Sequence, residues 1–281
     1  MAKRLALWLA PVPALLLVTL LLVIPVAEMI STSFHREEFG AILPGFTLVN
    51  YIDLLTRAST LEMMASTLAI ALTVTVITIV LGFPVAAVVA MAPARWRGTL
   101  YFLVAAPLLV NTVVRTYGWL LILGRKGLVN ETLAAMNLIS EPLALSGNAL
   151  GMTIGGAQVF LPFMVLSLVT SLMAIDNRLY EAGEILGAGP VRRFFTVTLP
   201  LTMPGLIAGS VLVFSMMLGA FVTPLILGGS AVKYVSVAVY TDALVLFNMP
   251  RATTLSLILM VIVLGLYLVQ QRYAHRNESP R

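Results

Sequence analysis

The sequence predicts an all-α membrane protein with six transmembrane helices, and two observations carry that prediction. Of the 281 residues, 60% are hydrophobic and only 10% are charged, whereas soluble domains are about 25% charged. The apolar residues form continuous runs rather than alternating with polar ones, which argues against a transmembrane β-barrel. We therefore expect a single transmembrane domain over residues 1–281, with the lipid bilayer as part of its solvent.

Each expected span is a run of about 20 or more mainly apolar residues. The chain begins Met1-Ala2-Lys3-Arg4 and is then uncharged from Leu5 to Ala27. That run is longer than the apolar stretch of about 7–15 residues in a cleaved signal peptide, so we expect an uncleaved first helix. The six expected spans are 7–30, 62–91, 98–123, 148–174, 203–228 and 253–272.

The distribution of charge orients these spans. If the N-terminus is cytoplasmic, the inside segments hold ten cations and four acids, whereas the outside segments hold six cations and seven acids. Because Lys and Arg concentrate in cytoplasmic loops, we expect a multi-pass protein with both termini in the cytoplasm. Within the spans, the pairs Gly151/Gly155 and Gly205/Gly209 are typical of closely packed helices.

Composition argues against several classes of function. The chain has no cysteine and two histidines, both beside apolar runs, so we expect no metal site and no thiol chemistry. The cations are scattered beside the spans, which favours topology signals over nucleic-acid binding. There is no G-x-x-x-x-G-K-[ST] loop for ATP phosphates. No histidine or acid pair accompanies a serine or threonine within a span, which argues against a membrane-embedded enzyme.

One polar stretch interrupts the apolar pattern between the fourth and fifth spans. Residues 178–188 predict a short helix that ends at Gly187, Gly189 and Pro190. Residues 191–198 predict a second short turn or helix, after which Pro200 and Pro204 are expected to redirect the chain into the fifth span. A simple re-entry loop needs neither this length nor this pattern, whereas a helix placed in a partner's groove needs both.

This stretch resembles the EAA loop of ABC-importer permeases, whose pattern is E-A-A, three residues, G, nine residues, I-x-L-P. Glycine for alanine inside a helix costs about 1 kcal/mol, so Gly183 is a departure that loosens the predicted helix, whereas Val197 for isoleucine is conservative. The matching positions are Glu181, Ala182, Gly183, Gly187, Val197, Leu199 and Pro200. The resemblance implies a type I ABC importer permease fold, with a cytoplasmic coupling-helix loop over about 176–202 that docks on an ATPase.

Further motifs resemble the spermidine/putrescine-type permeases. They are Asn50-Tyr51, Arg115-Thr116-Tyr117-Gly118-Trp119, Pro162-Phe163-Met164-Val165-Leu166, Pro200-Leu201-Thr202-Met203-Pro204-Gly205, and Val222-Thr223-Pro224 followed by Leu227-Gly228-Gly229. The resemblance implies a bacterial inner-membrane importer with a cytoplasmic ABC ATPase dimer, a sister permease and an extracytoplasmic solute-binding protein. ATP and Mg²⁺ would then belong to the ATPase, with no cofactor on this chain.

The solute implied by the resemblance is a polyamine, but the same branch includes permeases for other organic amines, amino acids, opines and phosphonates. A remoter alternative is a secondary transporter that works without ATP. Such a transporter would need intramembrane acids or a proton relay and would not need an EAA loop.

Two groups of side chains are candidates for the translocation pathway. Asn111, Arg115 and Trp119 follow helical spacing in the third span, and an intramembrane ionisable residue is a functional candidate by default. The alternative is a structural arginine, or one that snorkels beside an interfacial tryptophan. Tyr240 and Asp242 precede the sixth span, where they are suited to a cationic solute; the alternative is a solvated loop acid.

Overall fold

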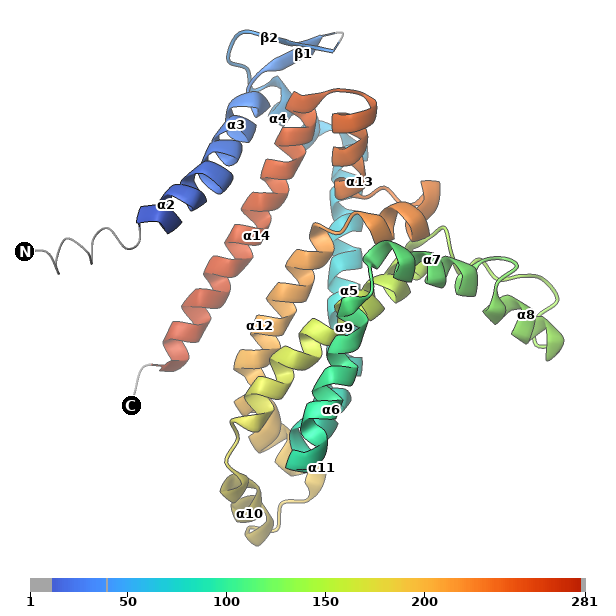
Figure 1. Ribbon diagram of the computed structural model, residues 1–281, viewed down its shortest axis with the longest axis vertical. Coiled ribbons are helices and arrows are strands. Elements are labelled where there is room, and N and C mark those ends of the chain that lie inside the picture. Colours follow the sequence, from blue (N-terminus) through green and yellow to red (C-terminus); the bar gives the residue numbers. More distant parts are fainter. Residues whose placement is uncertain (1–11, 39, 279–281) are drawn as a thin grey trace, which may run out of the picture. The chain divides into compact units, whose positions relative to one another are not determined.

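The computed structural model describes residues 12–38 and 40–278, and these are almost entirely helical (Figure 1). Five described helices are long and apolar enough to cross a membrane: Leu15–Ser33, Ala58–Met91, Ala149–Met173, Pro190–Leu218 and Met249–Arg272. A bent pair, Ala94–Leu109 with Thr112–Ala135, makes a sixth span if it is counted as one. The start of the first expected span, residues 7–11, and both chain ends lie outside the described residues.

The chain divides into two compact units. Unit one comprises the described residues up to 61 together with 238–261. It contains an antiparallel hairpin in which Glu37 pairs with Ile42. Its elements are α2 (Val12–Val18), η1 (Thr19–Val23), α3 (Ile24–Ser33), β1 (Arg36–Glu38), β2 (Ala41–Leu43), α4 (Val49–Thr56), η6 (Thr241–Val245) and the first part of α14 (Met249–Glu278).

The end of α3 is the anchor point within unit one. The Ser33 carbonyl accepts from Asn50 Nδ2 at 3.0 Å and from Thr254 Oγ1 at 3.3 Å. Asn50 Nδ2 also donates to the His35 carbonyl at 2.8 Å. These bonds satisfy the carbonyl groups that a helix end leaves without intrahelical partners, and they hold α3, α4 and α14 together.

Unit two comprises residues 62–237 and the described residues from 262 onward. It begins with most of α5 (Ala58–Met91). Within unit two, α9 (Ala149–Met173) and α12 (Leu199–Leu218) pack side by side (Figure 1). After α5, the elements of unit two in chain order are α6 (Ala94–Ala105), η2 (Ala106–Leu109), α7 (Thr112–Leu123), α8 (Leu128–Ala135), α9, α10 (Asn177–Ile185), α11 (Pro190–Arg193), η3 (Phe194–Thr198), α12, η4 (Pro224–Gly228), η5 (Gly229–Ala231), the first part of α13 (Val235–Tyr240) and the last part of α14.

The close packing expected from the glycine pairs is confirmed, between α12 and α9 at Gly205 and between α9 and η4 at Gly155. Ser167 Oγ donates to the Gly205 carbonyl at 2.8 Å. A Cβ built on Gly205 would lie 2.7 Å from the Ser167 carbonyl oxygen, and one on Gly155 would lie 2.5 Å from Leu227 Cδ1. Real Cβ atoms do not approach so closely, so glycine is what lets these segments come together without a hydrophobic driving force in lipid.

The third expected span, 98–123, is not one continuous helix. Its two halves bend by 88°, because η2 contains Pro107 and Val110 is extended. Asn111 then begins α7 as its N-cap, with Oδ1 accepting from Val113 N at 2.8 Å. Asparagine is a strong N-cap residue, and proline disrupts helix continuation. Asn111 therefore starts a helix rather than lying on the face of one.

The fifth span also differs from its expected bounds of 203–228. It is one helix over Pro190–Leu218, so the expected redirection of the chain at Pro200 and Pro204 is wrong. The π-turn η3 ends just before Pro200, which lies in the first turn of α12, and Pro204 lies inside that helix. Proline has no amide hydrogen to donate within a helix. The π-turn changes the hydrogen-bond register just before Pro200, so the helix continues without that bond.

Candidate functional site: an exposed helical elbow

The strongest candidate site is the elbow, defined as residues 176–202, which runs from the end of α9 into the first turn of α12. Its helix α10 lies beyond the ends of both long helices in unit two (Figure 1). Asp176 caps its helix α10, because its Oδ1 accepts from Arg178 N at 2.9 Å. Both ends of so short a helix need such partners, since nucleating an isolated helix is unfavourable.

Gly187 terminates α10 in a left-handed conformation. Its φ is +73°, its N–H donates to the Glu184 carbonyl at 2.9 Å, and the next N–H, of Ala188, donates to the Gly183 carbonyl at 2.9 Å. This is the Schellman arrangement, in which glycine is favoured because L-residues with a Cβ are strained there. The left-handed backbone conformation at Gly187 therefore explains why the EAA pattern has glycine there.

Two side-chain contacts join α10 to the segment that leads into α12. The hydroxyl oxygens of Tyr180 and Thr198 lie 3.2 Å apart, and Arg193 Nη1 pairs with Glu184 Oε2 at 3.3 Å. A Cβ at Gly183 would come within 3.3 Å of Arg193 Cγ. The departure from alanine at Gly183 therefore gives the stem of Arg193 room to lie against α10.

A third contact joins the elbow to α5. The rings of Phe194 and Phe83 meet edge to face with centroids 5.2 Å apart, and Phe194 packs in the same way on Phe195 at 5.1 Å. Aromatic pairs in this geometry are favourable beyond their buried area. Because α11, η3 and α12 form one uninterrupted helix, movement of α10 would reach two long helices, α5 and α12.

The outer surface of the elbow is apolar and exposed. Ile185 is 86% exposed and Leu186 is 82% exposed. Leu179, Val191 and Phe195 are exposed as well, as are Glu181 and Ala182. Apolar side chains gathered at the end of a short helix, rather than packed on their own protein, mark a surface for a partner. The remaining motif positions Val197 and Leu199 are half-buried, and Pro200 is exposed.

The pathway candidates of the third span lie on α7. Arg115 is half-buried, and its Nη2 makes a long 3.4 Å contact with Thr112 Oγ1. Its Nε and Nη1 are buried without a hydrogen-bond partner among the described residues. Trp119 donates to Gln158 Oε1 at 3.3 Å, which ties α7 to α9; Gln158 was not anticipated, since nothing in its sequence context indicated that partner.

The other candidates, Tyr240 and Asp242, belong to unit one. Asp242 is buried, and its carboxylate pairs with Arg251 Nε at 3.2 Å. It is therefore not a solvated loop acid. Burial raises the pKa of the Asp242 carboxyl, and Arg251 opposes that shift. Tyr240 lies on the exposed side of α13. Tyr234, six residues before Tyr240, is buried in unit two and donates to the Met217 carbonyl at 2.7 Å.

Among the described residues, no group of three or more His, Asp or Glu side chains is placed to hold a metal ion.

A helical multi-span chain whose exposed elbow is joined to two of its long helices has the architecture of a membrane permease subunit. The chain belongs to the family of the binding-protein-dependent transport system inner membrane component, whose model matches residues 82–278. The elbow lies inside that match, and the chain is a transport subunit rather than an enzyme.

Relatives extend the match to nearly the whole chain. The chain is 34% identical over 251 residues to the spermidine/putrescine transport system permease protein PotB of Haemophilus influenzae, covering 89% of this chain and 87% of the relative. It is 34% identical over 247 residues to PotB of Escherichia coli, covering 88% and 89%. The molybdenum transport system permease protein ModB of Azotobacter vinelandii is 32% identical, but over only 58% of this chain and 71% of its own length.

Solved structures agree with the expected type of fold. A bacterial ABC transporter involved in the import of the acidic polysaccharide alginate superposes with a TM-score of 0.76 at 17% identity, covering 99% of this chain and 98% of the other. The MetNI methionine ABC transporter, in an inward-facing conformation, superposes with a TM-score of 0.57 at 17% identity, covering 80% and 96%. The fold is therefore that of an ABC importer permease.

Proposed function

We propose that this permease subunit imports a polyamine, spermidine or putrescine, using ATP hydrolysed on a separate subunit. The observation that carries the choice of solute is the 34% identity to the two PotB permeases over almost nine-tenths of this chain. The motifs that suggested this branch lie in several of the spans and in the elbow, so the similarity is not confined to a generic apolar pattern.

Energy for transport would arrive through the elbow. The exposed Ile185 and Leu186 suit a groove on a cytoplasmic ABC ATPase dimer, which would bind ATP and Mg²⁺. Closure of that dimer would push α10, and the contacts Tyr180–Thr198 and Phe194–Phe83 would pass the displacement to α12 and α5. The family motif supports this role for Glu181, Ala182, Gly183, Gly187, Val197, Leu199 and Pro200.

The assembly would contain a sister permease and an extracytoplasmic solute-binding protein. The charge bias of the loops supports an orientation with both termini and the elbow in the cytoplasm. Solute selectivity would then reside mainly in the binding protein, since the spans hold no cluster of acids suited to a dication.

For the pathway within this chain, we retain Asn111, Arg115 and Trp119 in unit two and Tyr240 with Asp242 in unit one. The Asp242 carboxylate already pairs with Arg251, so a cationic solute would have to compete with that arginine. Tyr240 is exposed, and its aromatic ring would supply a cation–π contact to a cationic solute.

The second candidate function is import of an anionic or zwitterionic solute by the same mechanism. The observation that favours it is Arg115, whose Nε and Nη1 have no partner among the described residues. A guanidinium in that condition is suited to a carboxylate or phosphonate, as an amino acid, opine or phosphonate would provide.

Uptake of labelled putrescine and spermidine decides between these solutes. Cells that lack the gene, and have no redundant polyamine importer, should lose uptake and regain it when the gene is restored. Unchanged polyamine uptake would instead direct the search to anionic solutes and Arg115. Uptake that survives ATP depletion but stops with an uncoupler would contradict an ATP-driven importer.

A further inference from the structure

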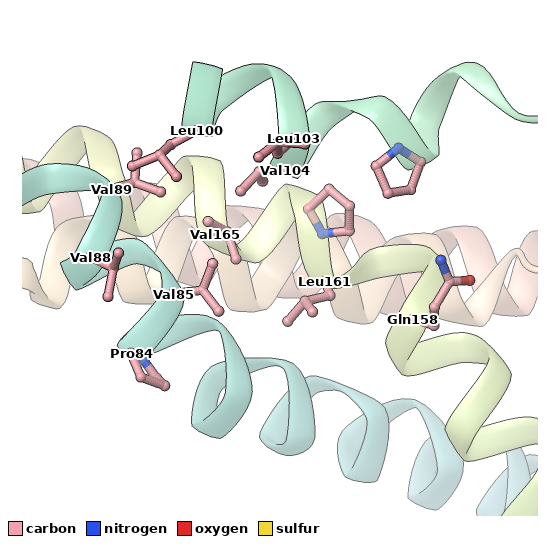
Figure 2. Close-up of a pocket in the computed structure, with 12 residues that line it drawn as sticks. Pro84, Val85, Val88, Val89, Leu100, Leu103, Val104, Gln158, Leu161 and Val165 are labelled. Atoms are coloured by element: carbon pink, nitrogen blue, oxygen red, sulfur yellow. The ribbon is translucent and has the colours of Figure 1, made fainter. Parts of the chain in front are cut away.

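Unit two contains an apolar groove of about 520 Å³. Its walls come from residues 84–89 of α5, 100–107 of α6 and η2, and 158–165 of α9. Figure 2 shows the valines of α5 and the leucines of α6 and α9 directed toward a common space. All three helices contribute to spans, so the groove lies at membrane depth.

The groove is open along one side and nearly free of polar groups. Val85, Val88 and Leu103, which line it, are 38%, 60% and 59% exposed. Gln158 is the single lining residue with a polar side chain, and its Oε1 already accepts from Trp119. A polar solute would therefore lose its hydration here without replacement, which makes the groove unsuitable as the solute path.

The groove suits a thin apolar occupant. Residues 100–107 and 158–165 each advance by about 10 Å along their helices, a length that part of one acyl chain covers. A segment of the sister permease is the competing occupant, and the experiment below distinguishes the two.

One end of the groove carries an unneutralised cation. Arg97 lies three and seven residues before Leu100 and Val104, so the three share one face of α6, and Arg97 stands one turn beyond the groove's end. Its Nη2 donates to the Ala90 and Ala92 carbonyls at 3.3 and 3.1 Å. Its buried Nε has no partner, and no carboxylate in the described part of the chain pairs with it.

We propose that this groove binds one acyl chain of an anionic phospholipid, whose headgroup phosphate pairs with Arg97. The apolar walls take the hydrocarbon, and the guanidinium at one end takes the charge, as in other basic pockets between transmembrane helices. The assignment to the cytoplasmic leaflet rests on the orientation in the proposed function. The bound chain would contact Pro84, which is adjacent to the Phe83 that packs on the elbow.

The test uses the intact transporter, purified with its partner subunits and reconstituted with phosphatidylglycerol that carries a photoreactive acyl chain. Phosphatidylcholine with the same chain is the matched lipid. Photolabel should appear in peptides that cover 84–89 and 100–107, and it should be severalfold stronger with phosphatidylglycerol. This readout needs no transported solute, so its failure would be distinct from failure of the proposed function.

Three variants sharpen the experiment. Leu103→Trp, which fills the groove, should abolish the labelling of these peptides with either lipid. Arg97→Gln should reduce labelling by phosphatidylglycerol about tenfold, as expected for the loss of a charged hydrogen bond, and reduce labelling by phosphatidylcholine less, because the choline cation partly neutralises that lipid's phosphate. Arg95→Gln, on the opposite side of α6, is the charge-matched control and should behave as wild type.

Three results would overturn the proposal. They are labelling confined to other peptides, equal labelling by the two lipids in the wild type, and a segment of the sister permease crosslinked within the groove in place of lipid. Native mass spectrometry of wild type and Leu103→Trp provides a second readout. The variant should assemble normally while it retains fewer phosphatidylglycerol molecules.

Discussion

The phenol oxygen of Tyr180 lies 3.2 Å from the hydroxyl oxygen of Thr198, 18 residues further along the chain. This contact joins the exposed helix α10 to the segment that becomes α12. It is a polar connection between the proposed ATPase-binding surface and a long helix. If the elbow transmits force, this connection should carry part of it.

Removing the Tyr180–Thr198 contact should weaken coupling. We expect Tyr180→Phe and Thr198→Val each to lower uptake per ATP hydrolysed about two- to tenfold, because one hydrogen bond is worth about 0.5–1.5 kcal/mol. The double variant should be no worse than the stronger single one. Thr196→Val is the control, since the Thr196 hydroxyl donates to the Arg192 carbonyl in its own turn rather than to α10; equal losses in that control would contradict the interpretation.

Replacement of Gly187 should uncouple the transporter. Its φ of +73° costs a β-branched residue about 1–2 kcal/mol, so Gly187→Val should open the end of α10. ATP hydrolysis should continue while uptake falls, with membrane insertion unchanged. Gly187→Asn should retain most uptake, because asparagine tolerates this conformation. Wild-type uptake by the valine variant would contradict the coupling role of the elbow.

The packing of α9 on α12 should be sensitive to side-chain size at Gly205. A leucine there would collide with Ser167 and Ser171, and overpacking of this kind typically costs about 1–3 kcal/mol. We expect a lower Tm in detergent for Gly205→Leu. Gly265→Leu is the matched control in another long helix, because a Cβ there meets nothing within 4 Å. An equal fall in Tm for both variants would count against the close contact.

Replacing Asp242 and replacing Arg251, one at a time, should lower the stability of the fold by different amounts. The Asp242 side chain is 6% exposed and that of Arg251 is 34% exposed, so Arg251→Ala strands a buried carboxylate, whereas Asp242→Asn leaves a cation that reaches solvent. We expect the larger loss of stability for Arg251→Ala, up to about 3 kcal/mol.

The pH dependence of Arg251→Ala gives an independent check. Burial raises the pKa of Asp242, and Arg251 opposes this, so the variant's carboxyl should have a still higher pKa when folded. The folded state then binds a proton before the unfolded state does, and stability should increase as pH falls from neutral toward the carboxyl's ordinary range. A Tm deficit relative to wild type that does not shrink on acidification would contradict this account.

The sequence predicted the fold class and the elbow because both depend on local patterns. Apolar runs identify helices in lipid, and the helix-breaking sequence Gly187-Ala188-Gly189-Pro190 marks where α10 ends. The break at Val110-Asn111 was missed because hydropathy does not register an N-cap inside an apolar run. The continuity of Pro190–Leu218 through Pro200 was missed because it depends on a π-turn, which hydropathy and proline placement do not reveal.

The sequence also did not predict contacts between residues that lie far apart along the chain. Phe194–Phe83, Trp119–Gln158 and Asp242–Arg251 link positions whose neighbours in sequence give no indication of the partner. The first joins the elbow to α5, so the mechanical account depends on a contact that only tertiary structure provides. The last shows that Asp242 is half of a buried ion pair rather than a solvated loop acid, while its contact with a solute stays a prediction.

Site-specific photocrosslinking at Ile185 tests the central claim, that the elbow docks on an ATPase subunit. The chain has no cysteine, so Ile185→Cys provides a single thiol for a maleimide-linked benzophenone. Leu128→Cys in α8 is the matched control, because Leu128 is 65% exposed. The account predicts an adduct with the ATPase subunit from position 185 and none from position 128. If position 185 yields no ATPase adduct in the assembled transporter, the proposed docking surface is wrong.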